Sequence, residues 1–505
     1  MKKIAKCLLL GAFVLATMNS CNDYLDINAD PSVPQKTDAI NILPPMFAQM
    51  VRGEAFDTRF VGRYIQNFSI NGGTNADTYE RHGWPTGSDA TGEKWRSHYY
   101  SIGLNIDLIT DDATPKGNWD IVGAAKAIRA WSWQTTTDYH GDMILKQVWE
   151  PNRYIFDFDS QEDVYAEVVR LCNESLTYLD RKDGTARLAL GDLVYKGDIA
   201  KWKKFVYSIL ARNAHHISNK SNYKPDDVIK FCDLSLSSNA DNFAVPHANL
   251  SSTDANFFGT KRGNIGDYRP TTTIIRLLDG STFNNIRDPR LPIMFAPSPD
   301  TVWRGIPPLS VDPNPIGSTK RVLNLFGNVP VAATLYAGTG RWIFEDAAPH
   351  YIVTYAEILF IKAEAQFRKG DAADALVTLK NAVGAHMDFC GVSAANKATF
   401  LASAALPQVA ADVKMSDIMQ QKYIALYMHG ALETWVDMRR FRYDPLIYTT
   451  FVPLVGIQFF PDNNGKYAYR VRPRFNSEYV WNRASLDKIG GNNIDYHTYE
   501  TWNIK

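Results

Sequence analysis

The sequence lacks the short motifs that mark the common catalytic sites. It contains no G-x-S-x-G, no H-E-x-x-H and no G-x-x-x-x-G-K-[ST] segment. Glu433 and Asp437 are two carboxylates near Arg440, but their spacing places all three on one helix face. Glycoside hydrolysis instead needs two carboxyl groups on opposite sides of a cleft. We therefore predict a structural ion-pair network at these residues and a protein that is not an enzyme.

Metal-binding and disulfide patterns are also scarce. His215 and His216 are adjacent, so their rings leave a helix in different directions. The acidic run from Asp157 to Asp163 lacks the glycine and the final carboxylate of a calcium loop. We predict no metal site and no cofactor. The cysteines after residue 21 have no metal-binding spacing, and we expect three buried thiols: Cys172, Cys232 and Cys390.

Neither sign of charge is in excess, because 54 basic residues are balanced by 54 acidic ones. Nucleic-acid binding would need a clustered basic face, and no such cluster is evident. After the first residues, no uninterrupted apolar run reaches the length of a transmembrane helix. We therefore expect neither nucleic-acid binding nor a transmembrane helix after the first residues.

Residues 1–20 have the pattern of a signal peptide. Three lysines precede an apolar stretch over residues 7–16, which is too short for a membrane span. Ser20-Cys21 then resembles a lipobox, whose cysteine becomes the acylated first residue of the mature protein. The alternative is an ordinary signal peptide in which Cys21 is incidental. Diacylation would supply the two hydrophobic signals that stable anchoring requires.

No Pro/Ser-rich or charged linker divides the remaining chain, so we predict one domain over residues 21–505, with residues 21–34 as a flexible lipid-anchored tether. The clearest helical pattern lies within 351–385. Thr354 and Glu357 have the spacing of a capping box, and Gly370 is placed to end the helix. Small residues would let the next helix approach closely, as in tetratricopeptide repeats.

We expect about four such helix pairs, with early helices at 41–52 and 59–68 completing the set. The pairs lie near 100–140, 163–217, 351–385 and 416–442. Between 219 and 349 proline and glycine become frequent, and short β-like runs such as Arg321–Phe326 occur. The predicted fold class is mainly α, with long loops and small β-hairpins packed on the helix pairs.

Several segments, in this order along the chain, resemble the SusD/RagB family. They are CNDYLDINADPS, DLVYKGDIAKWKKFVYSILARNAHHIS, RDPRL, YAEILFIKAEA, QQKYIALYMHGALETWVDMRR and PRFNSEYVWN. The resemblance covers nearly the whole mature chain. It implies a SusD-like α-helical fold and a surface-facing lipoprotein of the outer membrane. It further implies that the protein binds a nutrient, by family frequency an oligosaccharide, and delivers it to a SusC-like TonB-dependent transporter.

Binding by exposed aromatic side chains is the chemistry that remains. Sugar rings stack on indole and phenol rings, while their hydroxyls need amide, carboxylate or guanidinium partners. The long loop over 69–93 supplies both, and in SusD-like proteins a ligand-binding aromatic lies in a comparable loop, with Trp84 as the best match here. The first candidate site therefore comprises Asn75, Tyr79, Arg81, His82 and Trp84.

A second candidate site lies in the middle region. Its aromatic and arginine residues are Phe257, Phe258, Arg262, Tyr268, Trp303, Tyr336 and Trp342. The alternative is that each aromatic belongs to a satellite cluster of the core beneath a long loop. Three alternatives to glycan binding remain open: a peptide-binding RagB-like lipoprotein, a surface hydrolase, and a helical scaffold for other surface proteins.

Overall fold

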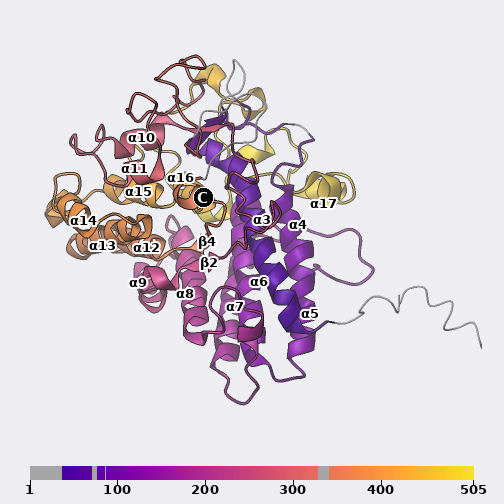
Figure 1. Ribbon diagram of the computed structural model, residues 1–505. Helices are drawn as coiled ribbons and strands as arrows, with labels where there is room; N and C mark the ends of the chain where they lie inside the picture. Colours follow the sequence, from indigo (N-terminus) through magenta and orange to yellow (C-terminus); the bar gives the residue numbers. More distant parts are fainter. Residues whose placement is uncertain (1–36, 71–76, 86, 328–339) are drawn as a thin grey trace, which may run out of the picture.

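The computed structural model describes residues 37–70, 77–85, 87–327 and 340–505 and is mainly helical, as predicted (Figure 1). The predicted signal peptide, Cys21 and the tether over 21–34 lie outside the described residues. None of the helices in the described ranges combines the length and the apolar character needed to cross a bilayer.

The first half of the chain forms the lower helical part of Figure 1. Its helices are α3 (Ala39–Tyr64), α4 (Gly92–Arg96), the π-helical segment η1 (Ser97–Leu104), α5 (Asn105–Ala113), α6 (Trp119–His140), α7 (Gln161–Asp180), α8 (Ile199–His216) and α9 (Pro225–Leu234). Neighbours along the chain pack side by side, α5 on α6 and α7 on α8.

The prediction of two separate early helices is wrong, because α3 is one helix. Residues between the two predicted helices continue the helix, and α4 provides partners for their polar side chains. The Lys94 ammonium lies 2.6 Å from a carboxylate oxygen of Glu54, and the Lys94 amide donates to the buried Asp57 carboxylate. The helix ends at Tyr64, so residues 65–68 are not helical.

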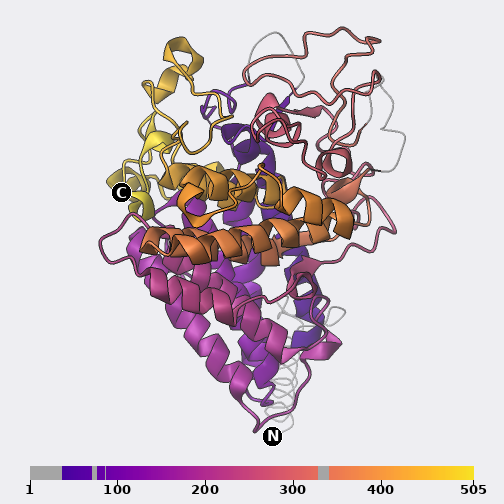
Figure 2. The ribbon, with the colours of Figure 1, turned by 90° about the vertical axis from the view of Figure 1, so that its left-hand side faces the viewer.

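The second half supplies α10 (Thr272–Leu278), α11 (Leu291–Met294), α12 (Tyr355–Lys369), α13 (Ala372–Cys390), α14 (Ala394–Leu401), α15 (Met415–Ala425), α16 (Ala431–Arg440) and α17 (Arg483–Lys488). In Figure 2 the orange helices, which include α12 and α13, run across the direction of the magenta helices. The predicted pairs α12–α13 and α15–α16 are neighbours, and α12 also packs on α8, α9 and α15.

Helix caps explain why these helices begin and end where they do. Ser160 and Asp198 accept hydrogen bonds from the amides of Asp163 and Lys201 at the starts of α7 and α8. Thr354 caps α12 in the same way, and Gly370 ends it with a left-handed φ of 96°. Glu357, however, does not complete a capping box, because both its carboxylate oxygens accept hydrogen bonds from Arg212 of α8, at 2.6 and 2.8 Å.

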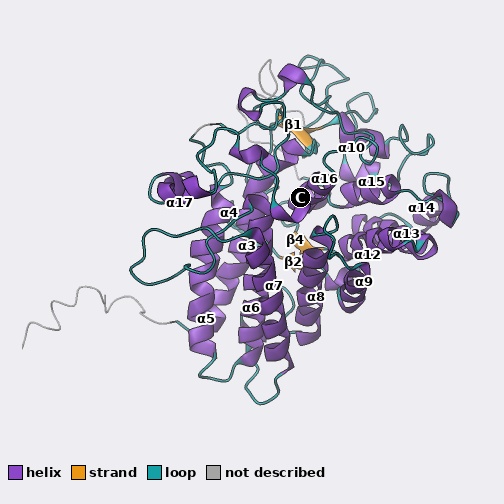
Figure 3. Ribbon diagram, turned by 180° about the vertical axis from the view of Figure 1, so that it is seen from behind, coloured by secondary structure: helices purple, strands orange, loops and turns teal. Residues whose placement is uncertain are grey.

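In the described residues, the strands do not form the predicted small β-hairpins. β1 (Phe68–Ile70) pairs antiparallel with β3 (Tyr268–Pro270), and β2 (Phe243–Val245) pairs antiparallel with β4 (His350–Val353). Figure 3 marks β1, β2 and β4 in orange. Arg321–Phe326 contains no strand. Because each strand pairs with a distant segment, the short sheets attach the middle region to the helices instead of forming independent hairpins.

Candidate functional site

The predicted ion pairs at Glu433, Asp437 and Arg440 are confirmed, and they belong to a larger buried network. Arg440 lies 2.5 Å from Asp437 and 2.8 Å from Glu364 of α12, while Lys422 of α15 lies 2.7 Å from Asp437. Glu433 lies 2.8 Å from His216 of α8. Because α8, α12, α15 and α16 all contribute, the network fixes how these helices pack.

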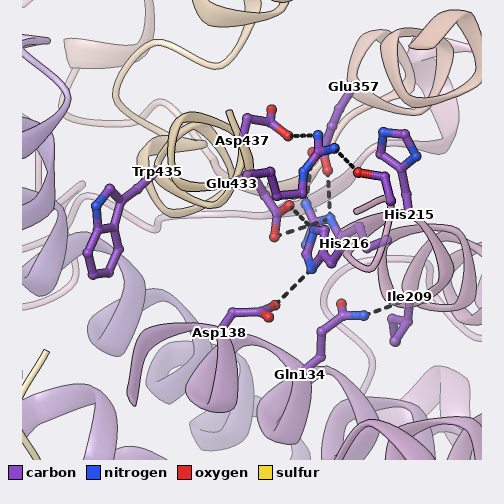
Figure 4. Close-up of polar contacts among 12 residues, drawn as sticks. Gln134, Asp138, Ile209, His215, His216, Glu357, Glu433, Trp435 and Asp437 are labelled. Carbon is purple, nitrogen blue, oxygen red and sulfur yellow. Dashed lines mark hydrogen bonds and ion pairs between the residues drawn. The ribbon is translucent and has the colours of Figure 1, made fainter. Parts of the chain in front are cut away.

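His216 lies between two buried carboxylates (Figure 4). Its Nε2 lies 2.8 Å from Glu433 and its Nδ1 lies 3.1 Å from Asp138. Burial alone would lower the pKa of His216, but the charges of Asp138 and Glu433 raise it to about 9. The ring is therefore an imidazolium near neutral pH, and the arrangement serves stability.

Asp138, His216 and Glu433 also have the chemistry of metal ligands and lie close together. The geometry favours a proton over a metal ion, because each carboxylate faces a different ring nitrogen of His216. One ion would coordinate only one of these nitrogens. Figure 4 shows the group enclosed by helices, and all three residues are buried.

The N-terminal loop, which holds the first candidate residues, is fixed against the C-terminal tail. The Arg81 guanidinium donates hydrogen bonds to the carbonyls of Ile457 and Phe459, at 3.1 and 2.9 Å. The Phe460 amide donates to the Arg81 carbonyl at 3.0 Å. Arg81 therefore has a positioning role in the structure, and its predicted contact with ligand stays a prediction.

His82 is buried in the same contact. Its ring stacks on Tyr64, with ring centroids 4.9 Å apart, and its Nδ1 accepts a hydrogen bond from the Ala468 amide. Burial lowers the pKa of His82 to about 3, so the ring is neutral at ordinary pH. With 1% of its surface exposed, His82 offers no surface to a ligand in this conformation.

The expectation that Trp84 is exposed is wrong, since only 2% of its surface is accessible. Tyr79, 8% exposed, packs edge-on against it with centroids 6.0 Å apart. The Trp84 ring nevertheless forms part of the wall of a cleft of about 350 Å³, called here the Trp84 cleft. Its other walls include Arg472, Phe475, Tyr479, Arg483 and Asn492 of the tail.

The Trp84 cleft combines ring faces with polar groups. Phe475 and Tyr479 stack with centroids 5.5 Å apart and planes 16° apart. Arg483 is exposed and makes no ion pair within the described residues. An aromatic surface beside a free guanidinium and the Asn492 amide suits a ligand with apolar C–H faces and hydroxyl groups.

Phe475 and Tyr479 are not among the site residues predicted from the sequence. Their spacing of four residues in PRFNSEYVWN predicts two rings on one side of a helical turn, which is the signal that would have found them. That this turn meets the N-terminal loop depends on a distant contact. The Phe475 amide donates to the Asp89 carboxylate at 2.8 Å, across 386 positions of sequence.

The second candidate set does not reach the Trp84 cleft. Trp303 is half-buried and donates its indole N–H to the Phe295 carbonyl at 3.0 Å. Trp342, also half-buried, packs edge-on against Phe389 of α13 with centroids 6.1 Å apart. Asn75 and Tyr336 lie outside the described residues. Ligand binding by these four residues stays a prediction.

A row of packed aromatic rings joins members of both candidate sets. It runs from Trp84 and Tyr79 through Phe60 and Phe56 of α3 to Phe257, and neighbouring ring centroids lie 4.9–6.1 Å apart along Tyr79–Phe60–Phe56–Phe257. Tyr268 of β3 stacks on Phe68, 4.7 Å away. Phe257 and Arg262 line a separate cleft of about 440 Å³ beside α3. The row connects Trp84, which lines the Trp84 cleft, with Phe257, which lines the cleft beside α3.

Comparison with known families places this fold and this site in context. The chain matches a family model described as "SusD-like_2: Starch-binding associating with outer membrane" over residues 31–453. No curated protein sequence matches the chain.

Solved structures resemble the chain over nearly its whole length. A SusD/RagB family protein from Bacteroides thetaiotaomicron is 22% identical with a TM-score of 0.70, and the match covers 93% of this chain and 99% of that one. A protein named as chitin-binding is 20% identical with a TM-score of 0.71, covering 93% and 100%. A chitin-binding SusD homologue from Flavobacterium johnsoniae is 17% identical with a TM-score of 0.70, covering 92% and 98%. At these identities the likeness establishes the fold.

Proposed function

Because the chain belongs to the SusD-like family of outer-membrane-associated proteins, we propose that it is a surface-exposed lipoprotein that binds a nutrient oligosaccharide. It delivers this ligand to a SusC-like TonB-dependent transporter, and Cys21 carries the lipid anchor. The absence of catalytic motifs and the structural role of Glu433 and Asp437 support a binder that does not cleave its ligand.

The observation that carries the proposal is the Trp84 cleft. Its stacked Phe475 and Tyr479 rings offer faces for sugar C–H groups, and Arg483 and Asn492 offer donors for hydroxyls. A cleft of about 350 Å³ accommodates a small part of a glycan chain, so the remaining sugar units lie across the surrounding loops. Two of the similar structures are named as chitin-binding proteins, and chitin consists of acetamido sugars. A glycan of such sugars is therefore among the first ligands to test.

The direct test is a binding screen of the purified mature protein against polysaccharides and peptide mixtures. Phe475→Ala is the informative variant, because its ring is half-buried, whereas replacing the buried Trp84 by alanine would remove about 3–5 kcal/mol of stability. Saturable glycan binding that weakens in Phe475→Ala supports the proposal. Saturable peptide binding would move the protein to the RagB-like class, and conversion of the glycan would identify a hydrolase.

The anchor and the partner are tested separately. Cys21→Ser should release the protein from the outer membrane, and unchanged membrane fractionation would contradict the lipoprotein assignment. Purification from the native membrane should recover a large β-barrel transporter together with the wild-type protein. Repeated recovery of the lipoprotein alone would argue against the transporter partnership, while leaving the glycan-binding test unaffected.

A further inference from the structure

A second and larger cleft, of about 540 Å³, lies on the other side of the tail segment that borders the Trp84 cleft. We call it the Trp149 cleft. It lies between η1, the loop that leads from Ile144 to Phe156, and the short π-helical turn η8 (Phe475–Tyr479). Its aromatic walls are formed by Trp95, Tyr99, Tyr100, Trp149 and Phe156.

Both π-helical segments of the described chain border this one cleft. Tyr99, Tyr100 and Leu104 come from η1, and Ser477 and Glu478 come from η8. π-helical turns account for well under 1% of residues in globular proteins and are frequent at functional sites. Two of them facing the same cleft indicate that its shape is maintained for binding.

Trp149 is held in the cleft wall by an unusually constrained arrangement. Its φ is 59°, a left-handed conformation that is unfavourable for a bulky residue. Its indole N–H donates to the Tyr99 carbonyl at 2.9 Å, and the Arg129 guanidinium lies 4.7 Å from its ring centroid. The ring also fills the space over Gly103, where a Cβ atom would lie 2.0 Å from the indole. Backbone strain of this kind persists at sites where it serves function.

Glu478 provides a buried carboxylate at the edge of this aromatic surface. Only 4% of its surface is exposed, and its two oxygens accept hydrogen bonds from the Trp95 indole at 3.2 Å and the Asn482 amide at 2.9 Å. Within the described residues it makes no ion pair, since Arg474 pairs with Asp89 instead. A carboxylate offers about four acceptor positions, so these contacts leave room for a ligand N–H or O–H.

We propose that the Trp149 cleft binds a 2-acetamido sugar of the glycan, a proposal that rests on the function proposed above. The exposed Tyr100 and the Trp149 face stack on the sugar ring, and the acetamido N–H donates to Glu478. The acetamido methyl group packs on the apolar wall, where a sugar with only hydroxyl groups would leave polar groups without partners. Because the tail segment 474–479 borders both clefts, one glycan chain can contact them in succession.

The test compares two ligands that differ only in this substituent. Purified mature protein is titrated with a chito-oligosaccharide and with a cello-oligosaccharide of equal length, since the β-1,4-linked chains differ by an acetamido group in place of a hydroxyl. We expect the chito-oligosaccharide to bind at least about tenfold more tightly. Glu478→Gln should remove most of this preference, and Tyr100→Ala, which loses a ring that stacks on the sugar, should weaken binding of the chito-oligosaccharide about tenfold.

Tyr154→Ala is the matched control, because Tyr154 is 82% exposed on the neighbouring loop and does not line the cleft. Tyr100 is 61% exposed, so its variant stays informative even if Glu478→Gln fails to fold. A chito-oligosaccharide affinity of Tyr100→Ala equal to that of wild type and Tyr154→Ala would overturn the proposal. If Phe475→Ala still lost glycan binding in that case, the function assigned to the Trp84 cleft would stand. Absence of binding by any glycan would contradict both. If Tyr100→Ala lost only the association with a protein partner, the cleft would be a docking site and the sugar proposal would be wrong.

Discussion

Arg440 and Arg483 both lie in the C-terminal part of the chain, yet their surroundings are opposite. Arg440 is buried in α16 and bonds two carboxylates and the Ser218 hydroxyl. Arg483 is exposed beside the Trp84 cleft and makes no ion pair in the described part of the chain. The tryptophans differ in the same way, since Trp435 of α16 is fully buried and Trp481 is 77% exposed.

This difference separates a scaffold from a binding face. In the scaffold, a buried charge is tolerated only when an opposite charge and hydrogen bonds compensate for its loss of hydration. Removing one partner is therefore strongly destabilising. On the binding face, a charge or ring without an internal partner remains available to a ligand. Substitutions in the scaffold should therefore change the free energy of unfolding, and substitutions on the binding face should change the affinity for glycan.

The largest expected effect is on stability. Arg440→Met would leave Glu364 and Asp437 buried without their shared guanidinium, and we expect a loss of about 3–5 kcal/mol in the free energy of unfolding. Denaturant unfolding measures this loss. Arg170→Met is the control, because Arg170 forms an exposed ion pair with Glu167 and should cost less than about 1 kcal/mol. Similar losses in both variants would contradict the scaffold role of the network.

The second expected effect is a pH dependence that belongs to the scaffold. The folded-state pKa of His216, about 9, lies above its unfolded value, so its contribution to stability is complete below about pH 6.5 and is lost as the pH rises through about 9. Wild-type stability should therefore fall on the alkaline side by on the order of 3 kcal/mol. His216→Gln should be less stable at neutral pH and should flatten this alkaline limb. An unchanged slope in the variant would show that His216 is neutral in the folded protein.

On the binding face, Phe475→Ala should weaken glycan binding about tenfold, which corresponds to about 1.4 kcal/mol. The variant removes half of the stacked pair with Tyr479. Because the ring is only half-buried, its unfolding free energy should change by less than about 2 kcal/mol. Titration calorimetry beside denaturant unfolding distinguishes the two quantities, and a loss of stability without a loss of affinity would place Phe475 in the scaffold.

The smallest expected effect is that of Arg483→Ala, which should weaken glycan binding about threefold through loss of an exposed donor. Lys488→Ala on the same helix is its control, since Lys488 pairs with Asp157 at 2.6 Å and does not line the cleft. Equal affinities for the two variants would remove Arg483 from the site.

The scaffold could be predicted from the sequence because its signals are local. Ser160, Asp198, Thr354 and Gly370 mark helix ends through contacts within three or four residues, and the apolar spacing sets the helices between them. Glu357 binds Arg212 instead of completing the capping box. This contact could not be predicted, because Glu357 and Arg212 are 145 positions apart. α3 was divided in the prediction for the same reason, since Lys94 satisfies its polar middle from another helix.

The binding face was largely hidden from sequence reasoning because it is assembled from distant segments. Ligand binding by Trp84 stays a prediction, and the tail residues that form its cleft follow it by several hundred positions. Tyr99 is half-buried against the core and also lines the Trp149 cleft, which is assembled from segments far apart in the sequence. No periodicity marks Trp149 as a site residue, since its role follows from its backbone conformation and the contact with Gly103.

Hydrogen–deuterium exchange of the mature protein, with and without saturating glycan, tests most directly whether the two regions divide stability and binding between them. Slower exchange on glycan binding is predicted in residues 77–85, 97–104 and 472–494, with exchange in α7, α8, α12 and α13 unchanged. Protection confined to α12 and α13, with no change at the tail, would contradict the account, because the ligand would then bind the helical scaffold.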